Sequence, residues 1–299
     1  MASTTKAKTQ KTVSDDSLKK RGQLRDIWKR FRSSKLAMVG LIIVLLIIFS
    51  SVFANFIAPY DPAEQNYSER LQYPSLQHLM GTDNYGRDLF SRLLYGGRVS
   101  LLVSLISLAI SLGLSALLGC IAGFFGGVVD TIIMRIMDLL MAIPGMLMSV
   151  AVAAMLGTSM FDTAMAVAIG GIAPGSRMFR AVIMTIRDQE YVEAARARGS
   201  RNARIIIKQI LPNALSPIIV DATLRIGSNI MQISGLSFIG LGVQPPTPEW
   251  GSILNTGREF VLTFWPMITF PGIMIMLTMF GFNVMGDGLR DALDPKLKR

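Results

Sequence analysis

Cysteine and histidine are almost missing from this sequence of 299 residues, which holds one of each, Cys120 and His78. A single cysteine cannot form an internal disulfide, and one histidine with one cysteine cannot build the protein-held cage of a transition metal. The phosphate-binding loop G-x-x-x-x-G-K-[ST] is absent too. No nucleophile and base stand out as a catalytic pair. We therefore expect a chain that is not an enzyme and that binds no cofactor or metal itself.

Charged residues are also scarce, at 17% of the chain, whereas 51% of the residues are hydrophobic. A bilayer core about 30 Å thick is crossed by roughly 20 apolar residues in a helix. Backbone groups inside lipid must be bonded within the helix, so the composition predicts an all-α membrane protein. We predict six transmembrane helices, at residues 36–58, 99–125, 131–157, 160–177, 214–236 and 265–285. Pro144, Pro174 and Pro271 are expected to kink or end these helices.

Positive charge is unevenly distributed. Residues 1–35 hold 11 Lys or Arg against 3 acids, and residues 177–212 hold 8 against 3. The segments 59–98 and 236–264 hold only 4 and 1 basic residues. The positive-inside rule then places both termini and the loop at 178–212 in the cytoplasm. The net charge of +10 is explained by this topology, and no nucleic-acid partner is expected.

These assignments divide the chain into segments. The predicted parts are a basic cytoplasmic N-terminal segment 1–35, the first helix 36–58, an external loop 59–98 with an interfacial helix, a transmembrane domain 99–286 with a cytoplasmic loop 178–212, and a cytoplasmic tail 287–299. In the interfacial helix, Asp88 and Arg92 stand four residues apart and are expected to pair.

The cytoplasmic loop contains YVEAARARGSRNARIIIKQILPN, residues 191–213. Good helix formers precede Gly199, and a second short helix is expected to follow and to end at Pro212. Small side chains at Ala194 and Ala195 allow another surface to approach closely, and Glu193 offers a charge to a partner. From the residues alone two interpretations stay open. The loop is either a docking knob or an amphipathic helix on the anionic inner leaflet.

The same residues carry a resemblance to a known family. Glu193-Ala194-Ala195, then Gly199, then Ile210-Leu211-Pro212 is similar to the EAA motif of permease subunits in binding-protein-dependent ABC importers. The general pattern places isoleucine ten residues after the glycine, where this chain has Gln209. Three further stretches, residues 78–101, 236–251 and 286–299, resemble the C-type subunit of dipeptide, oligopeptide and nickel importers.

The resemblance implies a type I ABC importer permease fold in the bacterial cytoplasmic (inner) membrane. It implies that residues 191–213 form a coupling helix that sits in a groove of a cytoplasmic ATPase. The implied partners are a B-type permease subunit, two ATPase subunits or domains that bind ATP and Mg²⁺, and an external solute-binding protein. The implied substrate is a short peptide, with glutathione-like peptides and nickel chelates as alternatives.

Two charged residues fall inside the fifth predicted helix. Asp221 and Arg225 are four residues apart, so they can neutralise each other along one helix face. We predict an intramembrane ion pair that faces the partner subunit or the pathway, with direct substrate contact as the alternative.

A proton-coupled transporter acting alone is the competing function. Such a protein needs a relay of buried carboxylates or histidines, and apart from Asp221 the predicted spans are poor in them. An internal inverted repeat would favour this function, and the sequence shows none.

Overall fold

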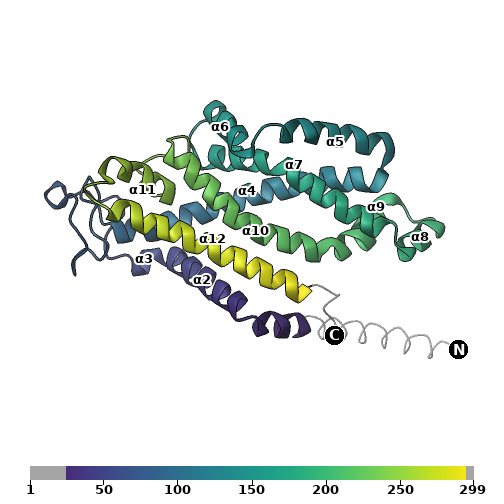
Figure 1. Cartoon of the computed structure of the whole chain (residues 1–299), viewed down its shortest axis with the longest axis horizontal. Helices are drawn as coiled ribbons and strands as arrows, with labels where there is room; N and C mark the ends of the chain where they lie inside the picture. Colours follow the sequence, from purple (N-terminus) through teal and green to yellow (C-terminus); the bar gives the residue numbers. More distant parts are fainter. Residues whose placement is uncertain (1–24, 294–299) are drawn as a thin grey trace, which may run out of the picture.

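The structure is a computed structural model that describes residues 25–293. These residues form a bundle of helices. Most of the helices run along the long axis of the molecule (Figure 1). Within the described residues the only β pairing is a single bridge between Thr82 and Asp88, so the all-α class is confirmed. The predicted N-terminal segment 1–35 and the predicted tail 287–299 lie partly outside the described residues.

α2 (Lys35–Val52) begins after Ser34, whose side chain accepts a hydrogen bond from the amide of Ala37. The short α3 (Ala54–Ile57) and the 3₁₀ turn η1 (Tyr67–Glu69) follow it. α2 lies against the last helix, α12 (Pro266–Leu293), and Gly40 and Gly281 allow the two backbones to approach closely.

α4 (Leu89–Phe125) joins the predicted interfacial helix and the predicted second span into one helix of 37 residues. Its two glycines at 96 and 97 do not interrupt it, because the ring of Trp250 packs over them. The separate interfacial helix within 59–98 is therefore wrong. Leu89 and Leu93, which it would place at the outer leaflet, are buried in the core beside Trp250.

The predicted third span, 131–157, is two helices rather than one. α5 (Gly127–Met141) and α6 (Gly145–Leu156) meet at a bend of 85°. Pro144 lies at the break, where it donates no amide hydrogen and disfavours helical geometry at the preceding residue.

α7 (Met160–Arg187) begins with a capping box between Ser159 and Asp162, and it passes through Pro174 without ending. The predicted end at 177 is too early. The arginines around this point, whose charges had suggested a loop, remain in the helix because acidic residues of α5 pair with them. Nη2 of Arg180 lies 2.6 Å from Oδ2 of Asp130.

The predicted loop 178–212 is largely helical. After α7 come α8 (Glu190–Ala197), α9 (Asn202–Ile205) and the π-helical turn η2 (Ile206–Ile210), which runs directly into α10 (Leu211–Phe238). The second short helix therefore does not end at Pro212. Proline is tolerated in the first turn of a helix, and Pro212 lies in the first turn of α10.

The other end of the bundle is closed by α11 (Trp250–Gly257) and the 3₁₀ turn η3 (Arg258–Phe260). Trp250 is fully buried, and its indole nitrogen donates to the carbonyl of Leu93 at 2.9 Å. α12 continues to Leu293 rather than ending at 285, so the first part of the predicted tail is helical.

Four helical stretches of the described chain are long and apolar enough to cross a membrane, and the bent pair α5–α6 raises the number to five. α7 does not reach that level of hydropathy, so the fourth predicted span, 160–177, is not established by composition. Figure 1 shows α8 and α9 at one end of the bundle and the loop before α4 at the other. The end of α12 and the start of α2 point toward the end with α8 and α9, and Phe31, Ala37 and Ala292 pack together there.

Candidate functional site

α8 is a short helix whose charges suit its ends. Glu190 and Glu193 lie in its first turn and Arg196 in its last. Each charge therefore interacts favourably with the helix dipole at its own end of the helix. Val192 and Ala195 are buried, whereas Glu193 and Ala194 are exposed. The EAA residues are therefore divided between a surface that anchors the helix and a surface that is free.

Gly199 ends α8 in a left-handed conformation, with φ of +74°. The amide of Gly199 donates to the carbonyl of Arg196 at 2.8 Å, and the amide of Ser200 donates to the carbonyl of Ala195 at 3.2 Å. These two bonds make a Schellman motif, which needs a residue that adopts positive φ easily. A Cβ atom at Gly199 would meet no heavy atom within 4 Å, so within this chain the backbone conformation alone explains the glycine.

α9 and η2 turn the chain back toward the bundle. Ile205 and Ile210 are buried, and Leu211 is half-buried. The apolar side chains of this segment are only partly covered, since Ile207 is 62% exposed. Pro212 is exposed at the start of α10.

A hydrophobic cluster fixes α8, α9 and η2 to the ends of α4 and α7. The cluster includes Cys120, Phe124, Phe179, Ile183, Val192, Ala195, Ile205, Ile210 and Ala214. The guanidinium of Arg196 lies 5.2 Å from the centre of the Phe124 ring, within range of a cation–π contact. α8 and α9 are therefore packed directly against the ends of α4 and α7 and the start of α10.

The link between α7 and α8 is held by Arg187. Its Nη1 donates to the carbonyl of Gly123 at 2.9 Å, and its Nε donates to Asp188 at 2.8 Å. The hydrogen bond from Arg187 holds the pKa of the Asp188 carboxyl below its usual value. This arginine joins the beginning of the candidate site to the end of α4.

The exposed part of α8, α9, η2 and their connections is mostly basic. It includes Arg196, Arg198, Arg201, Arg204 and Lys208 together with the acidic Glu190 and Glu193. Such a surface, made of exposed small residues and charges on a firmly packed base, can receive a protein partner. An anionic lipid surface would suit its basic residues but gives no role to exposed Glu193.

Asp221 and Arg225 form an ion pair in α10, with Nε of Arg225 2.6 Å from Oδ2 of Asp221. Nη1 of Arg225 also donates to the carbonyl of Gly171 in α7 at 2.9 Å. Asp221 borders a cavity of about 440 Å³ between α7, α10 and α12, which Arg290 borders as well. The pair thus joins two helices and places one carboxylate at the edge of a cavity.

The predicted pair of Asp88 with Arg92 does not form. Asp88 caps α4 by accepting from the amide of Ser91 at 2.7 Å, and its other oxygen contacts the imidazole of His78. Arg92 is turned instead toward Asp83, with 3.5 Å between Nε and Oδ2. An N-cap aspartate points along the helix axis, so it does not face the residue four positions later.

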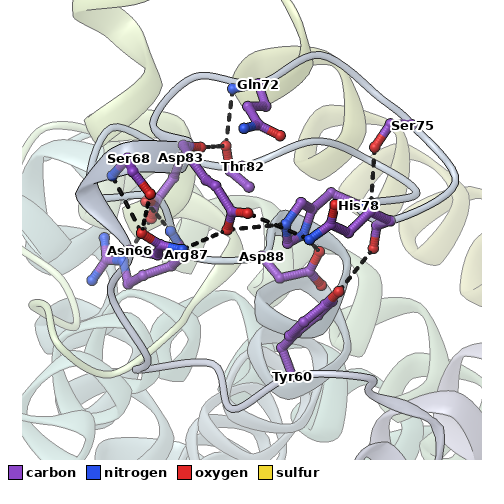
Figure 2. A network of polar contacts seen from close by, with 12 residues as sticks. Tyr60, Asn66, Ser68, Gln72, Ser75, His78, Thr82, Asp83, Arg87 and Asp88 are labelled. Carbon is purple, nitrogen blue, oxygen red and sulfur yellow. Dashed lines mark hydrogen bonds and ion pairs between the residues drawn. The ribbon is translucent and has the colours of Figure 1, made fainter.

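A buried polar network in the loop between α3 and α4 was not predicted at all. Asp83 and Arg87 are almost fully buried and pair at 2.6 Å, and His78 is 3% exposed. Figure 2 shows their side chains converging from separate turns of the loop, with Tyr60 beside His78. The cluster of charges in HLMGTDNYGRD was the available signal, but its pairing depends on the tertiary path of the loop.

Comparisons with known proteins agree with this architecture. The profile of the family described as binding-protein-dependent transport system inner membrane component matches residues 115–299. A second profile, the N-terminal TM domain of oligopeptide transport permease C, matches residues 22–74.

Three curated relatives are similar over nearly their whole length. The dipeptide transport system permease protein DppC of Alkalihalophilus pseudofirmus is 44% identical, over 92% of this chain and 90% of the relative. The di/tripeptide permease protein DppC of Pseudomonas aeruginosa is 44% identical, over 96% of each chain. The glutathione transport system permease protein GsiD of Shigella flexneri is 45% identical, over 91% of this chain and 90% of the relative.

A solved structure has a related fold. A chain of the MetNI methionine ABC transporter, in an inward-facing conformation, aligns with a TM-score of 0.52 at 15% identity. The alignment covers 68% of this chain and 94% of the transporter chain. At this level of identity the likeness concerns the fold alone.

Proposed function

Since this chain belongs to the family of binding-protein-dependent transport system inner membrane components, we propose that it forms half of a pathway that imports short peptides. The chain is a permease component of an ABC importer, and it resides in the inner membrane. The proposal concerns what it transports, how it is driven and which partners it meets.

We propose that ATP hydrolysis in a partner subunit drives transport. The motion of that partner would reach the permease through α8, Gly199 and α9. One observation carries this assignment: Val192, Ala195 and Ile205 are packed into the bundle, while Glu193, Ala194 and Gly199 stay exposed on top of them. An exposed, firmly anchored element can transmit a push from a partner into the helices beneath it. A loosely attached loop would absorb the same push.

Membership of the family also suggests the other subunits of the complex. We propose that this chain pairs with a B-type permease subunit and that each permease carries one cytoplasmic ATPase subunit or domain, where ATP and Mg²⁺ bind. An external solute-binding protein delivers the substrate. We also propose six spans, with α7 added to the five that hydropathy supports. An even number of spans places both termini on one side, and the positive-inside rule makes that side the cytoplasm. The 28 residues of α7 extend about 42 Å as a helix, which is enough to cross a bilayer.

Dipeptides and other short peptides are the proposed substrates, because the relatives named for dipeptide and di/tripeptide transport match almost the whole chain. Glutathione is the second candidate, and it is supported by a relative, 45% identical, that is named for glutathione transport. Nickel chelates and a proton-coupled mode of action have no comparable support.

The test is uptake by the complete complex in vesicles. We expect Glu193→Lys to abolish ATP-dependent peptide uptake, since it reverses the exposed charge of the proposed docking surface. The protein should remain in the membrane at its normal level, because this residue is exposed. Glu259→Lys, a charge reversal at an exposed residue of η3, is the matched control and should transport normally.

Two outcomes would contradict the proposal. Normal uptake by Glu193→Lys would show that α8 does not couple the permease to its motor. Uptake driven by a proton gradient in vesicles that lack the ATPase would favour the proton-coupled alternative.

A further inference from the structure

The loop between α3 and α4 encloses a small polar cavity that the transport mechanism does not use. Its volume is about 230 Å³, and it lies at the end of the bundle opposite α8. The residues around it are Tyr60, Glu64, Asn66, Glu69, Gln77, His78, Gly86 and Asp88. Three of them are carboxylates and none is Lys or Arg, so the cavity has a negative lining.

The cavity is built by close backbone packing. Gly86 has φ of +75°, and a Cβ atom there would lie 1.8 Å from the carbonyl oxygen of Asn66. Only glycine therefore allows the turn before α4 to press against η1. On the η1 side, the side-chain amide of Asn66 donates to Oε2 of Glu69 at 2.8 Å and holds that carboxylate at the cavity.

One wall of the cavity is a buried imidazole in a fixed orientation. Nδ1 of His78 lies 2.9 Å from Oδ1 of Asp88, and the ring of Tyr60 packs on the imidazole at 4.8 Å between centres (Figure 2). A carboxylate accepts hydrogen bonds, so in the neutral imidazole Nδ1 carries the proton and Nε2 is a bare acceptor.

Nε2 of His78 has no hydrogen-bond partner among the described residues. The group that faces it is Oε2 of Glu69, 3.6 Å away. A buried acceptor that faces a carboxylate oxygen is unfavourable unless a donor lies between them. The arrangement calls for a group that donates to both and carries positive charge.

A metal ion is a poor candidate for this group. In the part of the chain that the structure describes, no three His, Cys, Asp or Glu side chains converge closely enough to hold one. An ammonium group has three N–H donors and one positive charge, which match His78, Glu69 and Glu64 at the cavity.

We propose that this cavity is a binding site for a primary ammonium group that arrives from the side opposite α8. A tetrahedral ammonium that donates at about 2.9 Å to Nε2 and Oε2 needs these atoms roughly 4.7 Å apart, so Glu69 moves outward by about 1 Å. The Glu69 side chain is 26% exposed and has room for this movement. The ammonium belongs either to a free peptide or to a lysine side chain of a docked protein.

The single histidine of the chain makes a direct test available. The full chain, purified in lipid nanodiscs without a histidine tag, is labelled with [¹⁵N]histidine, so that its one imidazole gives the whole signal. Methylammonium is then titrated at neutral pH. We expect the resonance of a bare Nε2 that shifts saturably with methylammonium and does not shift with tetramethylammonium, which has the same charge and no N–H donor.

Variants and ligands refine the test. Glu69→Gln should weaken methylammonium binding about tenfold or more, since it removes a charged acceptor, and Glu259→Gln should leave it unchanged. N-acetyl-lysine methylamide carries only a side-chain ammonium, and glycylglycine only an α-ammonium. Tighter binding of the first identifies a docked lysine as the natural ligand, and tighter binding of the second identifies a free peptide.

Three results would overturn the proposal. An Nε2 resonance that does not respond to methylammonium means that water alone satisfies this nitrogen. A protonated Nε2 at neutral pH means that His78 bonds directly to Glu69 and needs no ligand. An equal response to tetramethylammonium means that the cavity attracts any cation and does not recognise an ammonium.

Discussion

Gly199 occupies a backbone conformation that other residues rarely adopt, yet the space around its Cα atom is open. A glycine in the EAA stretch can therefore have two different reasons, the backbone conformation and the need for free space. The Schellman motif at the end of α8 requires positive φ, which asparagine also adopts with little cost. The open space matters only if a partner fills it.

A pair of substitutions at Gly199 distinguishes these reasons. We expect Gly199→Val to lower the free energy of unfolding by about 1–2 kcal/mol, because a β-branched residue is strained at positive φ. Gly199→Asn should unfold at nearly the normal temperature. Both variants should lose ATP-driven uptake, since each adds a side chain to the surface assigned to the ATPase. Normal uptake by a stable Gly199→Asn would show that no partner approaches this position.

The contacts of Arg225 show which partners the spacing of residues predicts and which it does not. The interval of four residues predicts its pair with Asp221, and the structure has that contact. The third partner, the carbonyl of Gly171, lies in α7 and could not be read from the sequence. Gly175 lies at the same crossing, where its Cβ atom would lie 2.3 Å from Oγ of Ser115 and 2.8 Å from Nη2 of Arg225. The pair therefore connects α10 to α7, which supports a structural role.

Close contacts between helices depend on glycine at several crossings. A Cβ atom on Gly40 of α2 would lie 2.8 Å from the carbonyl oxygen of Gly281 in α12. A Cβ atom on Gly119 of α4 would lie 2.6 Å from the carbonyl oxygen of Ser176 in α7. Small residues at such crossings let backbones pack tightly, which is the main source of helix association inside lipid.

The contact between α2 and α12 can be tested by enlarging one glycine. We expect Gly40→Leu to destabilise the protein by about 1–3 kcal/mol, because the added atoms collide with backbone that cannot move aside. Gly113→Leu is the matched control, since that glycine is exposed in α4 with no atom within 4 Å of an added Cβ. The control should be as stable as the natural chain or slightly more stable. Thermal unfolding of both variants in the same detergent measures the difference, and equal midpoints would contradict the packing argument.

The start of α2 and the end of α4 were predicted to within one residue, because a long uncharged run begins or ends there. The first predicted helix, 36–58, ends earlier than expected, at Val52. Element borders were predicted poorly where tertiary contacts compensate polar residues. α7 continues past Arg177 and Arg180 because α5 provides Asp138 and Asp130, and no local pattern reveals that pairing. The exposure of Glu193 follows from the path of the chain after Gly199, so the motif indicated a docking region without showing which of its side chains are free.

At the scale of the whole molecule, the number of spans decides the location of the candidate site. α2, α4, the bent pair α5–α6, α10 and α12 account for five spans by length and hydropathy. If α7 also crosses, the start of α2, the end of α12 and α8 all lie on one side of the membrane. If α7 does not cross, the residues before and after it share a side, and the two ends of the chain lie on opposite sides.

Labelling of single cysteines resolves this question, because the natural chain has only Cys120, which is buried. In a Cys120→Ser background we expect an impermeant maleimide to label Gln65→Cys and Thr158→Cys from outside. Ser200→Cys should react only from the cytoplasmic side, in inside-out vesicles. Thr158 and Ser200 flank α7, so labelling of both from one side would remove α7 from the spans. Labelling of Ser200→Cys from outside would place α8 and α9 out of reach of a cytoplasmic ATPase, and the coupling proposal would fail with it.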